Sequence, residues 1–437
     1  MFIKNKVANN AVWIIGGKVV QSILGVVIAM LTARYLGPSN YGLINYASSL
    51  VAFVAPIAKL GLDSILVNEL INHSDREGET LGTSIIMSFV SGIFCIIGLV
   101  CFTLLANPGE QITVIVCALY SIVLLAHAIE LIQYWFQAHL LSKYTSIAML
   151  AAYIIKSVYQ VFLLISGSSI YWFAVTSALD IFVIDFIIYF LFRKMTGQKL
   201  AFSKSAARRM FRQSRYYIVS SMMVSIFANT DRIMIKMMLG DTQTGYYSAG
   251  VACAGLTSFI FSAIITSMRP VILEANGENE DKFKSLLVNL YSMIVYLSLI
   301  QCIGITIFAP IIVKILYGSS YASSVEPLRW IVWYTTFSYL GATRNIWILA
   351  KKKQSQLWKI NLIGALGNII LNLIFIPIWG ITGAAIASLF TQIITNFVLC
   401  FIIKELHPTL YFLKNGFDPR NMVNLIKKVI KIKENSR

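Results

Sequence analysis

The chain has 437 residues, of which 57% are hydrophobic and 13% are charged, and its formal net charge is +17. This composition, with a mean hydropathy of +0.74, excludes an ordinary soluble globular domain. A hydrocarbon core about 30 Å thick needs about 20 apolar residues per helical crossing, and the apolar runs here reach that length. They do not alternate polar and apolar residues, which excludes a membrane β-barrel. We therefore predict an all-α integral membrane protein.

Apolar runs long enough to cross a membrane recur along the whole chain and are separated by short polar segments. The first run lacks a small-residue cleavage site, so we expect a retained helix rather than a signal peptide. We predict twelve transmembrane helices, at approximately residues 8–35, 41–60, 81–106, 112–136, 144–167, 170–192, 216–239, 246–268, 286–309, 328–350, 358–377 and 381–403.

The positions of the basic residues predict the orientation in the membrane. With the amino terminus placed in the cytoplasm, three of the 36 Lys and Arg fall outside, five fall within spans, and the remaining 28 are cytoplasmic. Cationic loops resist translocation, so this asymmetry places both termini in the cytoplasm. The net charge therefore describes topology, and we expect no nucleic-acid partner.

The basic segment 193–215 has eight Lys and Arg, no acid, and apolar runs on both sides. We interpret it as a cytoplasmic linker between an amino-terminal bundle, residues 1–192, and a carboxy-terminal bundle, residues 216–405. Residues 406–437 would form a basic tail, either an amphipathic helix on the anionic inner leaflet or a disordered segment.

The two halves share a weak internal repeat. Gly37 and Gly42 correspond to Gly240 and Gly245 at a common offset of 203 residues, each pair at the turn between the first two spans of its half. Six spans is an even number, so both halves would have the same orientation, as in transporters built from parallel repeats.

The sequence contains no catalytic constellation. It has no GxxxxGK[ST] phosphate loop, no HExxH and no GxSxG motif, and its six cysteines lie within apolar spans without metal-ligand spacing. We therefore expect a protein that is not an enzyme and has no cofactor or metal.

Ionisable residues within spans are the candidate functional residues, because a charge at the bilayer centre costs about 2.5–3.5 kcal/mol. They either line a wet cavity that holds an anionic headgroup or form ion pairs, such as Asp180 with Lys156 or Glu130 with Lys18. Lys236 could instead snorkel to the outer surface. The candidates are the cations Lys18, Lys156, Arg232 and Arg344 and the acids Glu130, Asp180 and Asp231, the acids for coupling or ion pairing.

Three asparagines in spans, Asn229, Asn368 and Asn372, are candidates for the polar lining of the same cavity. Asparagines in spans more often bond one helix to another, so both roles stay open.

The order of several motifs resembles the Wzx-type O-antigen flippases of the multidrug/oligosaccharidyl-lipid/polysaccharide exporter superfamily, over about residues 5–405. The motifs are Leu36-Gly37…Tyr41-Gly42…Tyr46-Ala47, Asp231-Arg232…Leu239-Gly240…Gly245-Tyr246-Tyr247, Trp135-Phe136-Gln137, and Asn368…Asn372…Pro377…Gly380…Gly383-Ala384-Ala385.

This resemblance implies two pseudo-symmetric six-helix bundles around a central cavity, a fold like that of the multidrug and toxin extrusion (MATE) transporters, and alternating access. The implied substrate is an undecaprenyl-diphosphate-linked oligosaccharide, moved from the cytoplasmic to the periplasmic leaflet of a bacterial inner membrane. Its implied partners are the lipid-linked oligosaccharide, the phospholipid bilayer and other polysaccharide-assembly membrane proteins. Twelve spans, rather than the fourteen of lipid II flippases, favour the O-antigen branch. The rival reading is an ion-coupled multidrug exporter of the same superfamily.

Overall fold

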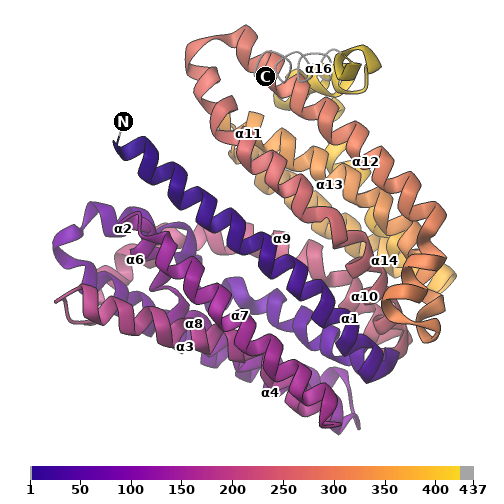
Figure 1. The fold of residues 1–437 in the computed structure, drawn as a ribbon, viewed down its shortest axis with the longest axis horizontal. Coiled ribbons are helices and arrows are strands. Elements are labelled where there is room, and N and C mark those ends of the chain that lie inside the picture. Colours follow the sequence, from indigo (N-terminus) through magenta and orange to yellow (C-terminus); the bar gives the residue numbers. More distant parts are fainter. Residues whose placement is uncertain (1, 424–437) are drawn as a thin grey trace, which may run out of the picture. The chain divides into compact units, whose positions relative to one another are not determined.

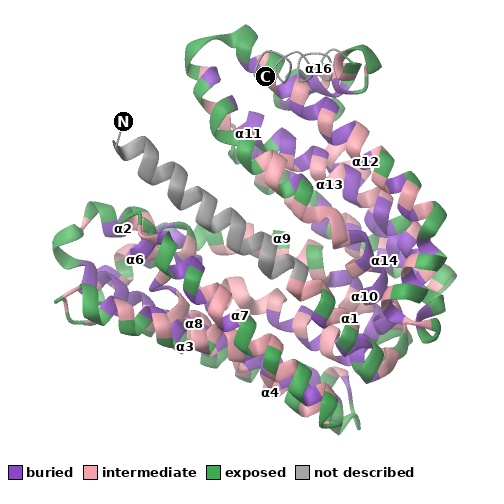
Figure 2. Ribbon diagram, viewed as in Figure 1, coloured by how far each residue is buried: buried purple, intermediate pink, exposed green. Residues whose placement is uncertain are grey.

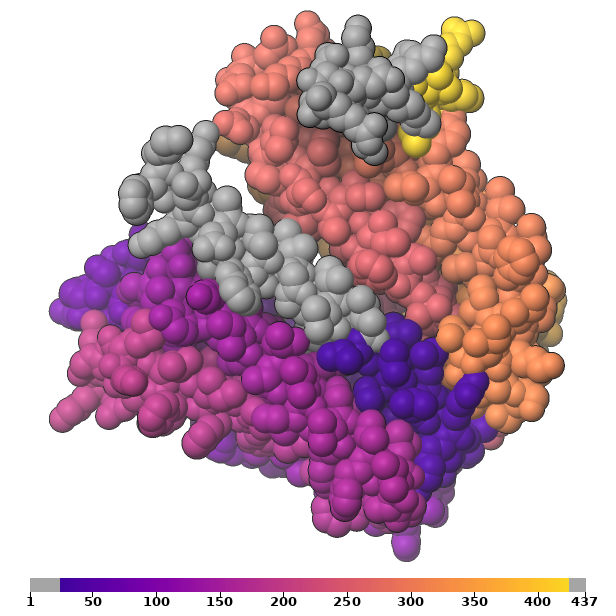
Figure 3. Space-filling view, viewed as in Figure 1, coloured from indigo at the N-terminus to yellow at the C-terminus, as the bar shows by residue number. Residues whose placement is uncertain are grey.

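A computed structural model describes the backbone of residues 2–423 and the side chains of residues 24–423; the remaining side chains are grey in Figures 2 and 3. Within this described part the regular structure is entirely helical (Figure 1). The α-helices are α1 (Phe2–Ala58), α2 (Leu66–Asn72), α3 (Glu77–Ala106), α4 (Gln111–Ser121), α5 (Val123–Glu130), α6 (Gln133–Ala138), α7 (Ser142–Ile165), α8 (Ile170–Met195), α9 (Lys204–Leu239), α10 (Asp241–Ala254), α11 (Ser258–Glu278), α12 (Glu280–Tyr317), α13 (Val325–Ala350), α14 (Ser355–Ile393), α15 (Leu399–Ile402) and α16 (His407–Gly416).

Nine helical stretches of the described part are long and apolar enough to cross a membrane, so the protein is a multi-pass membrane protein. Their outer faces carry large apolar side chains, for example Phe94 on α3 and Phe162 on α7, which are 71% and 60% exposed. In a bilayer, lipid covers side chains of this kind. Helix α13, which we predicted as a span, is not among the nine.

Two glycines break long helices at the turns that the sequence predicts. Gly37 in α1 has φ 71° and ψ 171°, and Gly380 in α14 has φ 59° and ψ −139°. Positive φ is readily adopted only by glycine, and Pro38 follows the first break. Each glycine lies between two predicted spans, so α1 and α14 each consist of two consecutive helical segments.

The chain divides into two compact units, Met1–Gly245 and Tyr246–Arg437. In unit 1, α1 packs against α3, α4, α7 and α9, and the buried side chains of its second segment, such as Tyr46 and Leu50, form a core with α3, α4 and α8. In unit 2, one core joins α11 to α16. There α16 packs on α12, where the Tyr296 hydroxyl donates to the Phe417 carbonyl at 2.9 Å. The amphipathic stretch predicted beyond residue 423 lies outside the described residues.

The basic segment 193–215 is ordered by contacts with α3. Helix α8 ends at Met195, and α9 begins at Lys204 behind an N-cap at Ser203. Between them, the Gln198 side chain accepts from the Gly78 amide at 2.7 Å, and the Ala201 amide donates to the Gly78 carbonyl at 3.2 Å. This connection therefore lies against the start of α3.

The repeat-related glycines make reciprocal contacts within unit 1. A Cβ at Gly42 would overlap the carbonyl oxygen of Asp241, and a Cβ at Gly245 would overlap that of Pro38. Each glycine thus packs on the residue four positions before its counterpart. The two contacts are equivalent under the 203-residue offset, and the repeat of the two halves stays a prediction.

Candidate functional site

Unit 1 contains a pocket of about 390 Å³ lined by both polar and apolar side chains, which we name the inner polar pocket. The second segment of α1 supplies one wall, and α4, α5, α8 and α9 supply the others. It is lined by Ser48, Val51, Ala52, Ala55, Pro56, Lys59, Asp63, Tyr120, Val123, His127, Ser177, Ile181 and Ser221. A cavity with hydroxyl, carboxylate, imidazole and ammonium groups offers both donors and acceptors.

Lys59 and Glu130 form an ion pair at this pocket. The Lys59 Nζ lies 2.9 Å from Glu130 Oε2, His127 Nδ1 lies 2.7 Å from the same oxygen, and Gln133 Nε2 donates to Oε1 at 3.1 Å. Lys59 is placed here because α1 ends at Ala58, after Pro56. The sequence offered Lys18 as a partner of Glu130; the partner seen among the described residues is Lys59, and the pairing with Lys18 stays a prediction. The side chain of Lys18 lies outside the described residues.

Lys156 on α7 and Asp180 on α8 form the other ion pair considered from the sequence. The Lys156 Nζ lies 3.0 Å from Asp180 Oδ2 and 5.9 Å from the centre of the Tyr153 ring. Asp180 Oδ1 is buried and has no hydrogen-bond partner within the described part of the chain. One carboxylate oxygen therefore remains available.

Arg232 lies half-buried on α9, and its Nε has no hydrogen-bond partner among the described residues. Tyr120 lies near Ser48 and close enough to Arg232 and Asp180 to be influenced by their charges. Since Tyr120 and Ser48 also line the inner polar pocket, the pocket, Arg232 and the Lys156–Asp180 pair belong to one polar region of unit 1.

Two other α9 candidates are placed differently. Asp231 is buried. The Asn229 amide donates to the Ser225 carbonyl of its own helix at 2.9 Å.

The candidates of unit 2 contact protein groups. Arg344 on α13 is buried, and its Nη1 donates to the Thr395 carbonyl at 2.7 Å. Asn368 and Asn372 are fully buried on α14; Asn368 donates to Ser388 Oγ at 3.2 Å, and Asn372 donates to Asn368 Oδ1 at 3.1 Å. The bond to Ser388 joins the two segments of α14 across Gly380. Asn368 thus makes a helix-to-helix bond of the kind that we weighed as the alternative role, whereas Asn372 bonds within its own helical segment; their role as cavity lining stays a prediction.

Lys236 is buried, although the sequence suggested that it could reach the outer surface. Its Nζ lies 2.6 Å from Glu110 Oε2 and 2.9 Å from Asp241 Oδ1. Only 2% of its side chain is exposed, while 46% of the Glu110 side chain is exposed. The turn at Gly240 brings Asp241 back over the last turn of α9. The short spacing between Lys236 and Asp241 in the sequence could therefore have predicted this ion pair. The Lys236 ammonium holds the pKa of the Glu110 carboxyl below its ordinary value.

Comparison with known proteins identifies the family. The model of the polysaccharide biosynthesis protein family matches residues 7–276. The Haloferax volcanii protein named probable low-salt glycan biosynthesis flippase Agl15 is 24% identical over 363 residues, covering 82% of this chain and 75% of that protein.

Two solved structures share the fold. The lipid II flippase MurJ in an inward closed conformation aligns with a TM-score of 0.72 at 16% identity, covering 94% of this chain and 92% of that one. An inward-facing multidrug resistance MATE family transporter of the MOP superfamily aligns with a TM-score of 0.70 at 14% identity, covering 91% and 96%. With the family match over more than half of its length, the chain belongs to the polysaccharide biosynthesis protein family, and its resemblance to the polysaccharide flippases is confirmed.

Proposed function

We propose that this protein is a flippase that moves a polyprenyl-diphosphate-linked oligosaccharide across the bilayer by alternating access. The family match over residues 7–276 is the observation that carries the proposal. The glycan biosynthesis flippase of Haloferax volcanii supports it, because the similarity extends over most of both chains. The protein would act as a transporter without catalysing a covalent step.

The polar region of unit 1 suits this substrate. A diphosphate and a hydrated glycan cross hydrocarbon only if protein groups replace their water. Arg232 is the cation best suited to the diphosphate, because it is only half-buried and its Nε is unpartnered among the described residues. The Nε of Arg344 is also unpartnered, but Arg344 is buried and donates to the Thr395 carbonyl, while Lys156 and Lys59 are neutralised by Asp180 and Glu130. The hydroxyls of the inner polar pocket would bond sugar hydroxyls.

We further propose the finer architecture expected from the sequence. Twelve spans would form two six-helix bundles, residues 1–192 and 216–405, joined by the basic segment 193–215, with both termini cytoplasmic. The breaks at Gly37 and Gly380 and the reciprocal contacts of Gly42 and Gly245 support the repeat. The carrier would be undecaprenyl diphosphate and the location a bacterial inner membrane.

An ion-coupled multidrug exporter is the second candidate. The MATE transporter shares the fold, and Asp185 on α8 is buried with both carboxylate oxygens unpartnered among the described residues, as an acid that binds a cation would be. A binding site for cationic drugs would favour buried acids of this kind. A cation such as Arg232 in the polar region would disfavour the binding of cationic drugs.

The experiment that tests the proposal removes the protein from its host and leaves the rest of the glycan pathway intact. We expect single repeat units to accumulate on polyprenyl diphosphate while surface glycan disappears, and the wild-type chain should restore both. Unchanged surface glycan together with sensitivity to cationic drugs would overturn the proposal and favour the exporter.

A further inference from the structure

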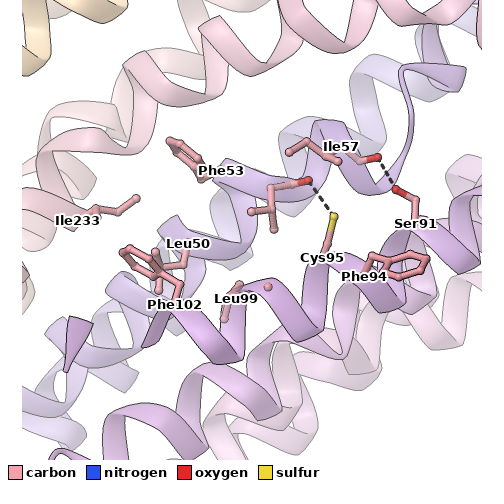
Figure 4. Close-up of a pocket in the computed structure, with 11 residues that line it drawn as sticks. Leu50, Phe53, Ile57, Ser91, Phe94, Cys95, Leu99, Phe102 and Ile233 are labelled. Atoms are coloured by element: carbon pink, nitrogen blue, oxygen red, sulfur yellow. Dashed lines mark hydrogen bonds between the residues drawn. The ribbon is translucent and has the colours of Figure 1, made fainter. Parts of the chain in front are cut away.

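A second cavity, of about 520 Å³, lies in unit 1 between α1, α3 and α9 (Figure 4). We name it the apolar groove. Its walls are Leu50, Phe53, Val54 and Ile57 of α1, Ile233 of α9, and the residues that α3 contributes, Ser91, Phe94, Cys95, Gly98, Leu99 and Phe102. Phe94 is 71% exposed, so the groove opens on a surface that lipid covers.

The polar atoms of the groove are already bonded within the protein. The Ser91 hydroxyl donates to the Ile57 carbonyl at 2.8 Å, and the Cys95 thiol lies 4.0 Å from the Val54 carbonyl as a weak donor. Figure 4 shows both side chains directed at the backbone of α1. These bonds join α3 to α1 and leave a hydrocarbon surface, which offers shape and van der Waals contact but no free hydrogen-bonding group.

Gly98 keeps part of the groove open. A glycine within a helix is less favourable than alanine, so its presence needs a reason. At Gly92, earlier on α3 and outside the groove lining, a Cβ would meet the Leu124 carbonyl at 3.0 Å, so close packing is the reason there. A Cβ at Gly98 would meet nothing within 4 Å, and its space lies in the groove. The lack of a side chain at Gly98 therefore leaves space in the apolar groove.

The apolar groove and the inner polar pocket share one helix as their common wall. Leu50, Phe53, Val54 and Ile57 face the groove, while the interleaved Val51, Ala52, Ala55 and Pro56 face the pocket. A helix with its side chains is about 10–12 Å across. A hydrocarbon site and a polar site thus lie one helix diameter apart, an arrangement that suits a molecule with a long apolar chain and a large polar head.

We propose that the apolar groove binds the polyprenyl chain of the substrate while the headgroup passes through the polar region on the other face of α1. This inference rests on the proposed flippase function. Bound there, the chain would stay in contact with α1 during transport, and the phenylalanine rings of the groove would pack against its methyl branches. An ordinary phospholipid has a small headgroup that needs no inner pocket. It therefore lacks the combination of a long apolar chain and a large polar head that would occupy both sites.

Filling the groove tests the inference in cells. Gly98→Leu places a side chain in open space and improves helix propensity, so the protein should fold. We expect export to fall about tenfold, the equivalent of about two lost methylene contacts, with lipid-linked repeat units accumulating at normal protein abundance. Gly304→Leu on α12 is the matched control, because a Cβ there also meets nothing within 4 Å and Gly304 lies outside the groove. Full export by Gly98→Leu would overturn the inference.

Photocrosslinking tests binding directly on the purified full chain. Benzoylphenylalanine would replace Phe102 in the groove or Phe162, an exposed residue of α7 outside it. The probes are radiolabelled long-chain polyprenyl phosphate and radiolabelled phosphatidylglycerol. We expect polyprenyl labelling at Phe102 to exceed that at Phe162 and to fall in the Gly98→Leu background. Equal labelling at both positions, or phosphatidylglycerol labelling Phe102 as strongly, would overturn the inference and show an ordinary lipid surface.

The two proposals fail in different ways. If deleting the protein causes no accumulation of lipid-linked repeat units, the flippase function fails. If deletion causes accumulation and Gly98→Leu restores export fully, the function stands and the groove inference fails.

Discussion

Replacing Lys236 with methionine should destabilise unit 1 through the loss of one buried cation. The Lys236 ammonium is 2.6 Å from a Glu110 oxygen and 2.9 Å from an Asp241 oxygen, and it joins the last turn of α9 to the segment before α4. Methionine keeps the length and most of the volume of the side chain, so the change removes charge and hydrogen bonds with little loss of packing. Without Lys236, the two carboxylates would face each other without a cation.

The size of the effect follows from burial. Breaking a buried ion pair by removing one partner costs about 3–5 kcal/mol. Here the Lys236 side chain is 2% exposed, but Glu110 is 46% exposed and can regain water, which places the cost at the low end. We therefore expect the free energy of unfolding to fall by about 3 kcal/mol in Lys236→Met.

The assay is reversible unfolding of the purified protein in mixed micelles as the fraction of denaturing detergent rises. Lys314→Met is the matched control, because Lys314 also lies four residues before a glycine cap, here Gly318 on α12, but is exposed and has no ion pair in the described structure. The control should change stability by less than about 0.5 kcal/mol. Equal effects of the two substitutions would refute the role of the buried cluster.

Three further predictions concern pH, helix packing and transport. The pKa of Glu110 lies below its ordinary value in the folded protein, so its stabilising contribution is complete above the unfolded pKa of about 4.5 and is lost as pH falls through the folded pKa. Unfolding measured in increasingly acidic buffer should show this loss of stability, and Glu110→Gln should remove this pH dependence. Gly42→Ala should destabilise the protein by at least about 1–3 kcal/mol, because the added Cβ would overlap a backbone carbonyl, whereas Gly304→Ala should not destabilise it. Equal unfolding free energies of the two variants would contradict the reciprocal contact. Arg232→Ala should lower glycan export about 10-fold to 150-fold, which corresponds to the loss of about 1.5–3 kcal/mol from a charged hydrogen bond. Arg232→Lys should retain more export, and equal export by both variants would exclude a role for the positive charge of Arg232.

The helices and their interruptions were predictable because they depend on local properties. Apolar run length marks the membrane helices, and glycine at Gly37 and Gly380 marks the places where the backbone takes a positive φ. Helix α13 was also predicted as a span but is not among the nine apolar stretches, so its crossing of the membrane stays a prediction. Its Tyr, Trp, Thr and Arg side chains make it less apolar than the neighbouring helices.

The partners of the charged residues were less predictable, because helical periodicity gives the face of a residue and not the neighbouring helix. Asp180 and Lys156 were paired correctly as one alternative, since they lie on consecutive helices. The pairing of Glu130 with Lys59 was not predicted, because Lys59 follows a helix end far away in the sequence and reaches the polar pocket only in the folded chain. Lys236 was misplaced for a related reason, since the turn at Gly240 folds Asp241 back onto it.

The most direct test of the flippase function is translocation in proteoliposomes. The purified protein would be reconstituted into vesicles with a fluorescent, polyprenyl-diphosphate-linked oligosaccharide in both leaflets, and a membrane-impermeant reagent would quench the outer pool. We predict that the protein makes the inner pool accessible, that Arg232→Ala slows this step, and that a fluorescent cationic drug is not transported. Drug transport with no movement of the lipid-linked oligosaccharide would contradict the proposal.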